Sequence, residues 1–222
     1  MKTLDELAGE GITHLAIEAS SHGLDQHRLD GVRLTAGAFN NLGRDHLDYH
    51  PTIEDYLQAK LRLFGELLQP GQMAVMNADG PFAERATDAA KARGLIVRTT
   101  GSAGADIKLV KAERDGFEQQ LTVSAGGKTY PLRLKLLGTY QATNALVAAA
   151  LAMACGVVTD TSIAALEHFD GVKGRLEVVV IVARQVSRVR GGGEGGQAAR
   201  QGQHGAEEFF GVSSFDFEDV VE

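Results

Sequence analysis

Carboxylate, hydroxyl, amide and guanidinium groups crowd into one short run, EASSHGLDQHR, from Glu18 to Arg28. The apolar residues 13–19 before it predict a strand buried on both faces, and open α/β sheets bind ligands at the carboxyl ends of such strands. A carboxylate beside hydroxyls and a guanidinium can hold Mg²⁺ and an anionic substrate together, because Mg²⁺ combines one or two protein oxygens with phosphate oxygens. A polar loop around a buried, hydrogen-bonded Glu18 is the alternative, and the residues alone leave both interpretations open.

A second polar run, NLGRDHLDYH, occupies residues 41–50 after another apolar segment. Its histidines His46 and His50 are four residues apart, a spacing that suits zinc on a helix. Pro51 and Thr52 follow, however, and Thr52 has the character of a helix N-cap, so the helix begins after both histidines. Two histidines and two aspartates at a strand end favour a role in orienting phosphates and a metal. A surface loop rich in turn-forming residues is the alternative.

The predicted helix over residues 53–68 carries a lysine within its apolar stripe. The stripe consists of Ile53, Tyr56, Leu57, Leu61, Phe64, Leu67 and Leu68. Lys60 lies four residues from both Tyr56 and Phe64. On residue type alone a lysine that extends along the surface to water is favoured. The alternative is a partly buried amine with a lowered pKa, whose neutral form could react or be modified.

One apparent phosphate-binding motif fails. Gly127-Lys128-Thr129 has the ending of a phosphate-binding loop, but Thr122 stands where the first glycine belongs. The run also lies between two predicted strands, whereas the motif requires a strand followed by a helix. We therefore predict a hairpin turn.

The remaining pattern alternates strands with helices and contains a β-rich insert, which indicates an α/β fold. Strands are predicted at residues 13–19, 34–40, 73–77, 95–99, 106–113, 117–125 and 128–137. Helices are predicted at residues 53–68, 82–93, 141–155 and 160–169.

Composition sets the remaining limits. The chain has 222 residues and a net charge of −7, which argues against a nucleic-acid-binding surface. Cys155 is the sole cysteine and lies in an apolar run, so we expect a buried structural thiol in a reducing compartment. Neither a signal peptide nor a membrane-spanning stretch is evident, which predicts a cytoplasmic location. From Ala183 the sequence is Gly-rich without period, and residues 179–222 are expected to be a disordered or non-native tail.

Several ordered motifs together resemble the Mur ligase family. They are IEASSHGLDQHR, NLGRDHLDYH, YLQAKLRLF, Asn77-Ala-Asp79, GTYQATNA from Gly138, and VKGRLE from Val172. Their order and spacing are similar to those of the family over roughly residues 10 to 178, and SSHGL is typical of the tripeptide-forming members. A folate or cyanophycin ligase is disfavoured, because those enzymes lack the Ser-Ser-His run.

The resemblance implies a partial central ATP-binding domain over residues 1–178. We expect a mostly parallel sheet with helices on both faces and a small antiparallel β insert. The implied reaction is ATP-dependent addition of a diamino acid, meso-diaminopimelate or L-lysine, to UDP-N-acetylmuramoyl-L-alanyl-D-glutamate through an acyl phosphate. ATP and Mg²⁺ are the implied cofactors, and the intact parent is expected to be a monomer that binds neither nucleic acid nor membrane.

The resemblance also implies roles for individual residues. Glu18 and His46 would bind magnesium, and His46 would act in catalysis. Lys60 would take up CO₂ as a carbamate and supply a carboxylate to a second magnesium, which reverses the interpretation favoured by residue type alone. Contacts to the UDP-linked sugar peptide or to the nucleotide are implied for Ser20, Gln26, Arg28, Asn77, Asp79 and Asn144, the last of these near adenine.

The sequence departs from the family pattern in several places. The family's phosphate-binding loop and first βα unit are expected upstream of residue 1, and its C-terminal domain is expected after Glu177. Asn40 stands where the family usually has Thr, and Tyr140-Gln141 where it has Phe-Asn. A frameshift near Val180 and poor solubility from uncovered strand edges are further hypotheses. An inactive fragment of such a ligase is therefore the alternative to a working enzyme.

Overall fold

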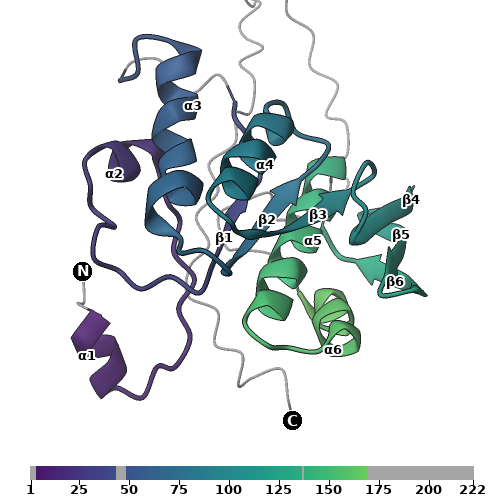
Figure 1. The fold of residues 1–222 in the computed structure, drawn as a ribbon. Coiled ribbons are helices and arrows are strands. Elements are labelled where there is room, and N and C mark those ends of the chain that lie inside the picture. Colours follow the sequence, from purple (N-terminus) through teal and green to yellow (C-terminus); the bar gives the residue numbers. More distant parts are fainter. Residues whose placement is uncertain (1–3, 44–48, 137, 170–222) are drawn as a thin grey trace, which may run out of the picture.

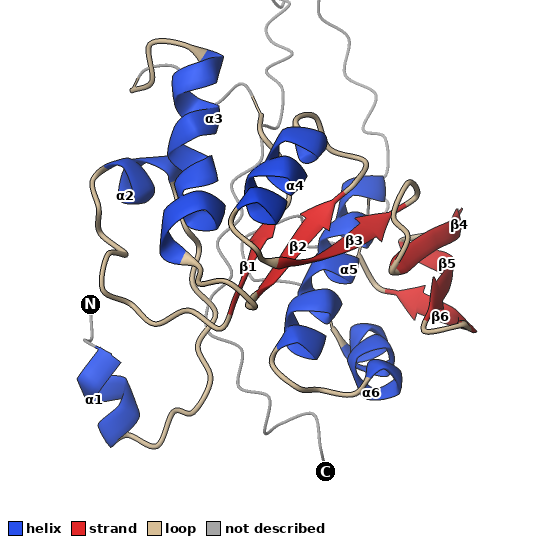
Figure 2. Ribbon diagram, in the orientation of Figure 1, coloured by secondary structure: helices blue, strands red, loops and turns tan. Residues whose placement is uncertain are grey.

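A computed structural model describes residues 4–43, 49–136 and 138–169 of the chain. A six-stranded sheet lies between two groups of helices (Figures 1 and 2). The strands are β1 (Ala36–Phe39), β2 (Met73–Asn77), β3 (Ile96–Gly101), β4 (Ile107–Asp115), β5 (Glu118–Ala125) and β6 (Lys128–Leu134). The α-helices are α1 (Leu4–Gly9), α2 (Ser21–Asp25), α3 (Ile53–Arg62), α4 (Ala83–Ala92), α5 (Thr139–Ala154) and α6 (Thr159–Ala164). A π-helical turn, Leu63–Leu67, continues α3, and a 3-10 turn, Ala165–His168, continues α6.

The sheet changes character along its width. Strands β1 to β4 are neighbours in chain order and pair in parallel, whereas β4, β5 and β6 form an antiparallel meander. The β5–β6 hairpin pairs Ala125 with Lys128 around Gly126 and Gly127, both with positive φ. The predicted hairpin turn and the predicted α/β fold with an antiparallel insert are therefore confirmed.

The central strand β2 separates two hydrophobic cores. Ala74 and Met76 belong to the core under α3 and α4, and Val75 belongs to the core under α5. All three side chains are fully buried, as expected for a parallel strand covered on both faces. Because successive side chains on a strand point to opposite faces, one short apolar run serves both cores.

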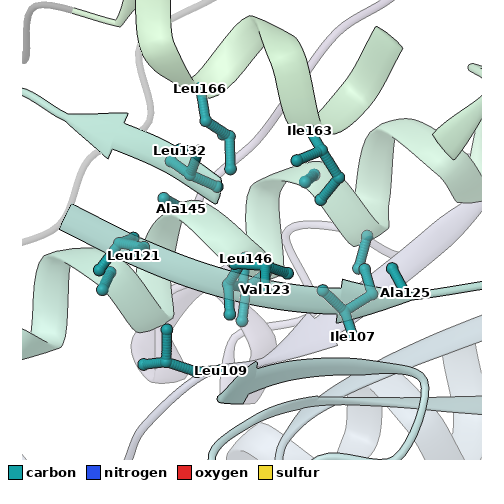
Figure 3. Packing of buried hydrophobic residues seen from close by; sticks show 14 of the residues in the cluster. Ile107, Leu109, Leu121, Val123, Ala125, Leu132, Ala145, Leu146, Ile163 and Leu166 are labelled. Carbon is teal, nitrogen blue, oxygen red and sulfur yellow. The ribbon is translucent and has the colours of Figure 1, made fainter. Parts of the chain in front are cut away.

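The second core joins the meander to α5 and α6. Leu121 and Val123 on β5 pack against Leu146 on α5, and Ile163 on α6 closes the same cluster (Figure 3). Seven of the sixteen residues of α5 are buried, and five of those seven are alanine. Helix α5 is apolar around most of its circumference, and its small side chains allow the helix axis to approach the sheet closely.

An N-cap at Thr52 starts helix α3, and a π-helical turn follows its last residue. Thr52 Oγ1 accepts a hydrogen bond from the Asp55 backbone N–H at 3.1 Å, which confirms the predicted N-cap. Its final π-helical turn rotates Leu63, outside the predicted stripe, into the core. Leu63 then packs over Gly37 of β1, where a Cβ atom would lie only 3.0 Å from Leu63 Cδ2.

Two predictions are wrong. Residues 13–19 form no strand, and Leu15 and Ile17 are 40% and 44% exposed. A strand exists only through pairing, and among the described residues β1 is an edge strand with its outer side unpaired. Cys155 is exposed, because it is the C-cap of α5 and lies beyond the last turn that packs on the sheet.

Some predictions fall outside the described residues. These include His46, the proposed boundary at residue 178 and the Gly-rich segment 179–222. No helix among residues 4–43, 49–136 and 138–169 has the length and apolar character needed to cross a membrane.

Candidate nucleotide and substrate site

Polar side chains meet where the parallel strands end. Asn40 follows β1 directly, and Asn77 is the last residue of β2. Asn77 Nδ2 donates to the Asn40 backbone carbonyl at 2.9 Å, and Asn77 Oδ1 accepts from the Asp79 backbone N–H at 3.1 Å. Asn77 is only 7% exposed, so its amide ties two strand ends together in a place that water barely reaches.

Asp79 continues this connection to β3. Its two carboxylate oxygens accept from the backbone N–H groups of Ser102 and Ala103, both at 2.7 Å. Gly101 at the end of β3 has φ +103°, and a Cβ atom there would lie 2.5 Å from Asp79 Oδ2. The carboxylate thus holds the loop after β3 closed, and only glycine at position 101 leaves room for it.

Asn144 belongs to α5, which covers the face of the sheet opposite to α3 and α4, and its side chain contacts Asn40. Asn40 Nδ2 donates to Asn144 Oδ1 at 2.5 Å. The structure therefore brings the three predicted nucleotide residues, Asn77, Asp79 and Asn144, into one connected group. We call Asn40, Asn77, Asp79 and Asn144 the strand-end cluster.

A second group lies at the C-terminal end of α2, beside α3. Arg28 Nη2 donates to Gln26 Oε1 at 2.6 Å, and Gln26 Nε2 donates to the Tyr49 hydroxyl at 3.3 Å. The Tyr49 hydroxyl donates to Asp25 Oδ2 at 2.7 Å. These four exposed, linked side chains are named the helix–loop cluster, and it contains two of the three predicted substrate residues.

The third predicted substrate residue, Ser20, has a local role in this structure. Its Oγ accepts from the Gly23 backbone N–H at 3.1 Å and caps α2. Next to this helix the rings of His22 and Tyr49 lie 3.9 Å apart, and the buried His50 stacks on Tyr56 at 5.3 Å. Aromatic packing therefore fixes the start of α3 against α2, which lie side by side in Figure 1.

Lys60 is half-buried on α3, with its Nζ 5.3 Å from the centre of the Tyr56 ring. Burial lowers the pKa of Lys60, and the negative charge of Glu18 acts in the opposite direction. Residue type alone favoured a lysine that extends along the surface to water, and the half-buried position favours the alternative of a partly buried amine. A lowered pKa raises the fraction of the amine in the neutral, nucleophilic form.

The described residues offer single candidate ligands for a metal ion and no complete set. Among them, no group of three or more His, Cys, Asp or Glu side chains is placed to hold a metal. Mg²⁺ does not need such a group, because it uses one or two carboxylates and takes the remaining oxygens from phosphates and water. Glu18 is an exposed carboxylate, a ligand type that Mg²⁺ accepts, whereas the unmodified amine of Lys60 supplies no oxygen to such an ion.

Arg62 is two residues after Lys60 in α3 and lies within the motif YLQAKLRLF, but the sequence analysis gave it no role. Its guanidinium donates to the Leu24 carbonyl, binds Asp30 at 3.3 Å and binds Glu66 at 2.8 Å. The side chain is only 14% exposed. Arg62 thereby fixes the loop that carries Gln26 and Arg28 onto α3. Asn40 was likewise missed, because its partners are 37 and 104 residues away.

Known proteins resemble this chain in sequence and in fold. The family model for the Mur ligase middle domain matches residues 1–152. The UDP-N-acetylmuramoyl-L-alanyl-D-glutamate--2,6-diaminopimelate ligase of Bradyrhizobium diazoefficiens is 56% identical over 182 residues, which are 80% of this chain and 38% of that protein. The ligase of the same name from Agrobacterium fabrum is 52% identical over 176 residues, which are 79% of this chain and 36% of that protein.

A solved structure with that ligase name superimposes with a TM-score of 0.72 at 28% identity. The match covers 79% of this chain and 36% of the solved one. The chain therefore spans less than two fifths of the length of these relatives. Taken with the parallel sheet and its polar strand ends, the family match shows that this chain belongs to the Mur ligase family, through its middle domain.

Proposed function

We propose that this chain carries the nucleotide-handling part of an ATP-dependent ligase. The ligase adds meso-diaminopimelate to UDP-N-acetylmuramoyl-L-alanyl-D-glutamate, a precursor of peptidoglycan. The observation that carries the proposal is the half-buried Lys60, whose pKa is lowered by burial while Glu18 lies nearby. Relatives at 56% and 52% identity are named as diaminopimelate ligases, which favours this diamino acid over L-lysine.

The proposed reaction joins a carboxylate to an amine in two steps. The side-chain carboxylate of the glutamate attacks the γ-phosphorus of ATP, giving an acyl phosphate and ADP. The amine of the diamino acid then attacks the acyl carbon, and the tetrahedral intermediate expels phosphate. Mg²⁺, if bound, would supply positive charge that offsets the repulsion between the two anions of the first step.

Lys60 prepares this site by a reaction of its own. The ammonium form of Lys60 first loses a proton to solvent; the neutral amine then attacks CO₂, an N–C bond forms, and a second proton leaves to give an anionic carbamate. A lowered lysine pKa favours the reaction, because the protonated amine has no lone pair to donate. The carbamate oxygens, Glu18 and His46 are then the proposed protein ligands for magnesium.

The two clusters take the two substrates. We assign the UDP-linked sugar peptide to Ser20, Gln26 and Arg28, and the nucleotide to Asn77, Asp79 and Asn144. Asn77 and Asp79 are proposed to act mainly by shaping the pocket, because their side chains already bind backbone groups. We propose further that the intact protein is cytoplasmic and monomeric, as the family resemblance implies.

A chimera tests the proposal directly. Residues 4–169 of this chain would replace the matching segment of the Bradyrhizobium relative, and ADP release would be measured with the UDP-dipeptide and meso-diaminopimelate. We expect turnover that requires both substrates and rises with added bicarbonate. Lys60→Met should abolish turnover, whereas the same change at the exposed Lys91 of α4 should preserve it.

Two outcomes would reject the assignment. The first is a folded chimera that shows no substrate-dependent ADP release. The second is a Lys60→Met chimera that is as active as the Lys91→Met control. Circular dichroism and thermal unfolding distinguish a folded, inactive chimera from one that has failed to fold.

The alternative is that the 222-residue chain by itself does not turn over. It is favoured by a specific observation, the match to only 38% of the length of the most similar relative described above. Under this alternative the chain alone binds ATP weakly and releases no ADP above background, while the chimera is active. Turnover by the isolated chain would exclude it.

A further inference from the structure

The four residues of the strand-end cluster are linked by hydrogen bonds that determine which way the Asn144 carboxamide is turned. A carboxamide has an oxygen that only accepts hydrogen bonds and a nitrogen that only donates them, and the two ends have nearly the same shape. Which end faces a ligand is therefore decided by the neighbours of the amide and not by its shape. In this cluster, backbone groups orient Asn77, Asn77 orients Asn40, and Asn40 orients Asn144.

Asn77 is oriented by two backbone groups whose roles cannot be exchanged. The Asp79 N–H can only donate, and it lies 3.1 Å from Asn77 Oδ1. The Asn40 carbonyl can only accept, and it lies 2.9 Å from Asn77 Nδ2. A flipped Asn77 would place two donors together at one end and two acceptors together at the other.

Asn77 in turn orients Asn40, and Asn40 orients Asn144. Asn77 Nδ2 also lies 3.4 Å from Asn40 Oδ1, so the oxygen of Asn40 faces a donor. Asn40 Nδ2 is thereby directed to Asn144 Oδ1, at 2.5 Å. Because Asn144 Oδ1 accepts from Asn40, Nδ2 is the polar atom of this side chain that remains to bind a ligand.

Within the described part of the chain, Asn144 Nδ2 lacks the hydrogen-bond partner that buried polar atoms normally have. Asn144 Nδ2 is buried and has no hydrogen-bond partner among the described residues. A buried donor without an acceptor costs free energy, and the great majority of such groups in native proteins are paired. A ligand atom that accepts a hydrogen bond would remove this cost on binding.

We propose that Asn40 is a positioning residue that holds the Asn144 amide with Nδ2 toward the base of the bound nucleotide. The base is then recognised through one of its hydrogen-bond acceptor atoms. This inference rests on the proposed nucleotide-binding function, and it gives Asn40 a role in setting which base is accepted.

The test exploits the fact that the polarity can be inverted. In Asn40→Asp the new carboxylate can only accept, so Asn144 must turn its Nδ2 toward residue 40 and its oxygen toward the ligand. Asn40→Ala removes the constraint without adding charge. Asn41→Asp is the matched charge control, because Asn41 is exposed and its Oδ1 caps the Leu42 N–H, which an Asp oxygen can also do.

The full 222-residue chain and its variants would be titrated with ATP and with its 1-deaza, 3-deaza and 7-deaza analogues, each lacking one ring acceptor. NMR detects binding even when it is weak. For the wild type we expect one analogue to bind about tenfold more weakly than ATP. For Asn40→Asp that same penalty should shrink to about twofold or less, because the inverted amide has no donor to lose. Asn41→Asp should change the affinity for ATP and all analogues equally, and therefore keep the wild-type penalty.

Each result has a defined meaning. If the wild type binds ATP but Asn40→Asp and Asn40→Ala retain the full penalty, Asn40 has only a structural role and the inference is overturned, while the proposed function stands. If the wild type binds neither ATP nor any analogue, nucleotide binding itself fails and the inference fails with it. A scalar coupling across the hydrogen bond from Asn40 ¹⁵Nδ2 to Asn144 ¹³Cγ, measured on the wild type, checks the orientation without any variant, and its absence would also overturn the inference.

Discussion

The strand-end cluster and the helix–loop cluster are built from similar polar side chains, yet they are held in opposite ways. In the first, Asn77 and Asp79 bind backbone groups of the sheet and its loops, and Asn77 is only 7% exposed. In the second, exposed side chains bind one another, as Arg28 binds Gln26 and Gln26 binds Tyr49. Backbone anchors are rigid and shielded from water, whereas exposed side-chain pairs are individually weak. Under the proposed function, the difference suits a rigid site for the nucleotide and a more adjustable one for the larger substrate.

The largest expected effect comes from breaking the rigid cluster at its centre. Asn77→Ala leaves the Asn40 carbonyl and the Asp79 N–H without their partner in a nearly dry place. We expect a loss of about 3 kcal/mol in the free energy of unfolding, since each buried unpaired group costs about 1–3 kcal/mol. Urea unfolding measures it. A loss no greater than that of Gln26→Ala in the exposed cluster would contradict the comparison.

The next effect comes from the loop that Asp79 closes. Gly101→Ala places a Cβ atom 2.5 Å from Asp79 Oδ2 at a residue with φ +103°. We expect a loss of about 2 kcal/mol from backbone strain and from the displaced carboxylate. Amide hydrogen exchange at Ser102 and Ala103 should quicken at the same time. Gly116→Ala serves as the control, because it has positive φ at a hairpin tip but nothing within 4 Å of the new Cβ.

A smaller effect is expected where Arg62 anchors the second cluster. Arg62→Lys keeps the charge but cannot bind the Leu24 carbonyl, Asp30 and Glu66 together, because an ammonium lacks the planar fork of a guanidinium. We expect about 1 kcal/mol of lost stability, with faster hydrogen exchange confined to residues 24–30. Arg85→Lys, which disturbs only an exposed pair with Glu54, should cost a few tenths of a kcal/mol at most. Equal effects of the two substitutions would show that Arg62 anchors nothing.

The smallest expected effect concerns the exposed ion pair between α3 and α4. Hydrogen bonds from Arg85 and then Gln58 lower the pKa of Glu54 from 4.5 to about 2. A lowered carboxylate pKa contributes stability that is present above pH 4.5 and is lost as the pH falls through 2. NMR titration should therefore give a Glu54 midpoint near 2 that moves back toward 4.5 in Arg85→Ala and in high salt. A midpoint unaffected by that substitution would rule out the pair as the cause.

The sequence predicted those structural elements whose interacting residues lie close together in the chain. The Thr52 cap, the helix that carries Lys60 and the β5–β6 hairpin all rest on neighbours within a few positions. Strand 73–77 was predicted with its observed bounds, because a short apolar run, 73–76, between turn residues has few alternatives. Residues 13–19 showed a similar apolar run, yet they form no strand because pairing depends on a neighbour that the run itself cannot supply.

By itself, then, the sequence determined the fold class, the family and the residue types available for chemistry, because these depend on local periodicity and on ordered motifs. Only the tertiary structure decided that Lys60 is desolvated near Glu18, that Arg62 anchors the α2 loop and that Asn40 connects Asn77 to Asn144. Burial, and hydrogen bonds that span 37 to 104 residues, arise from how strands and helices pack. A side chain acquires its pKa and its orientation from the neighbours that packing brings to it.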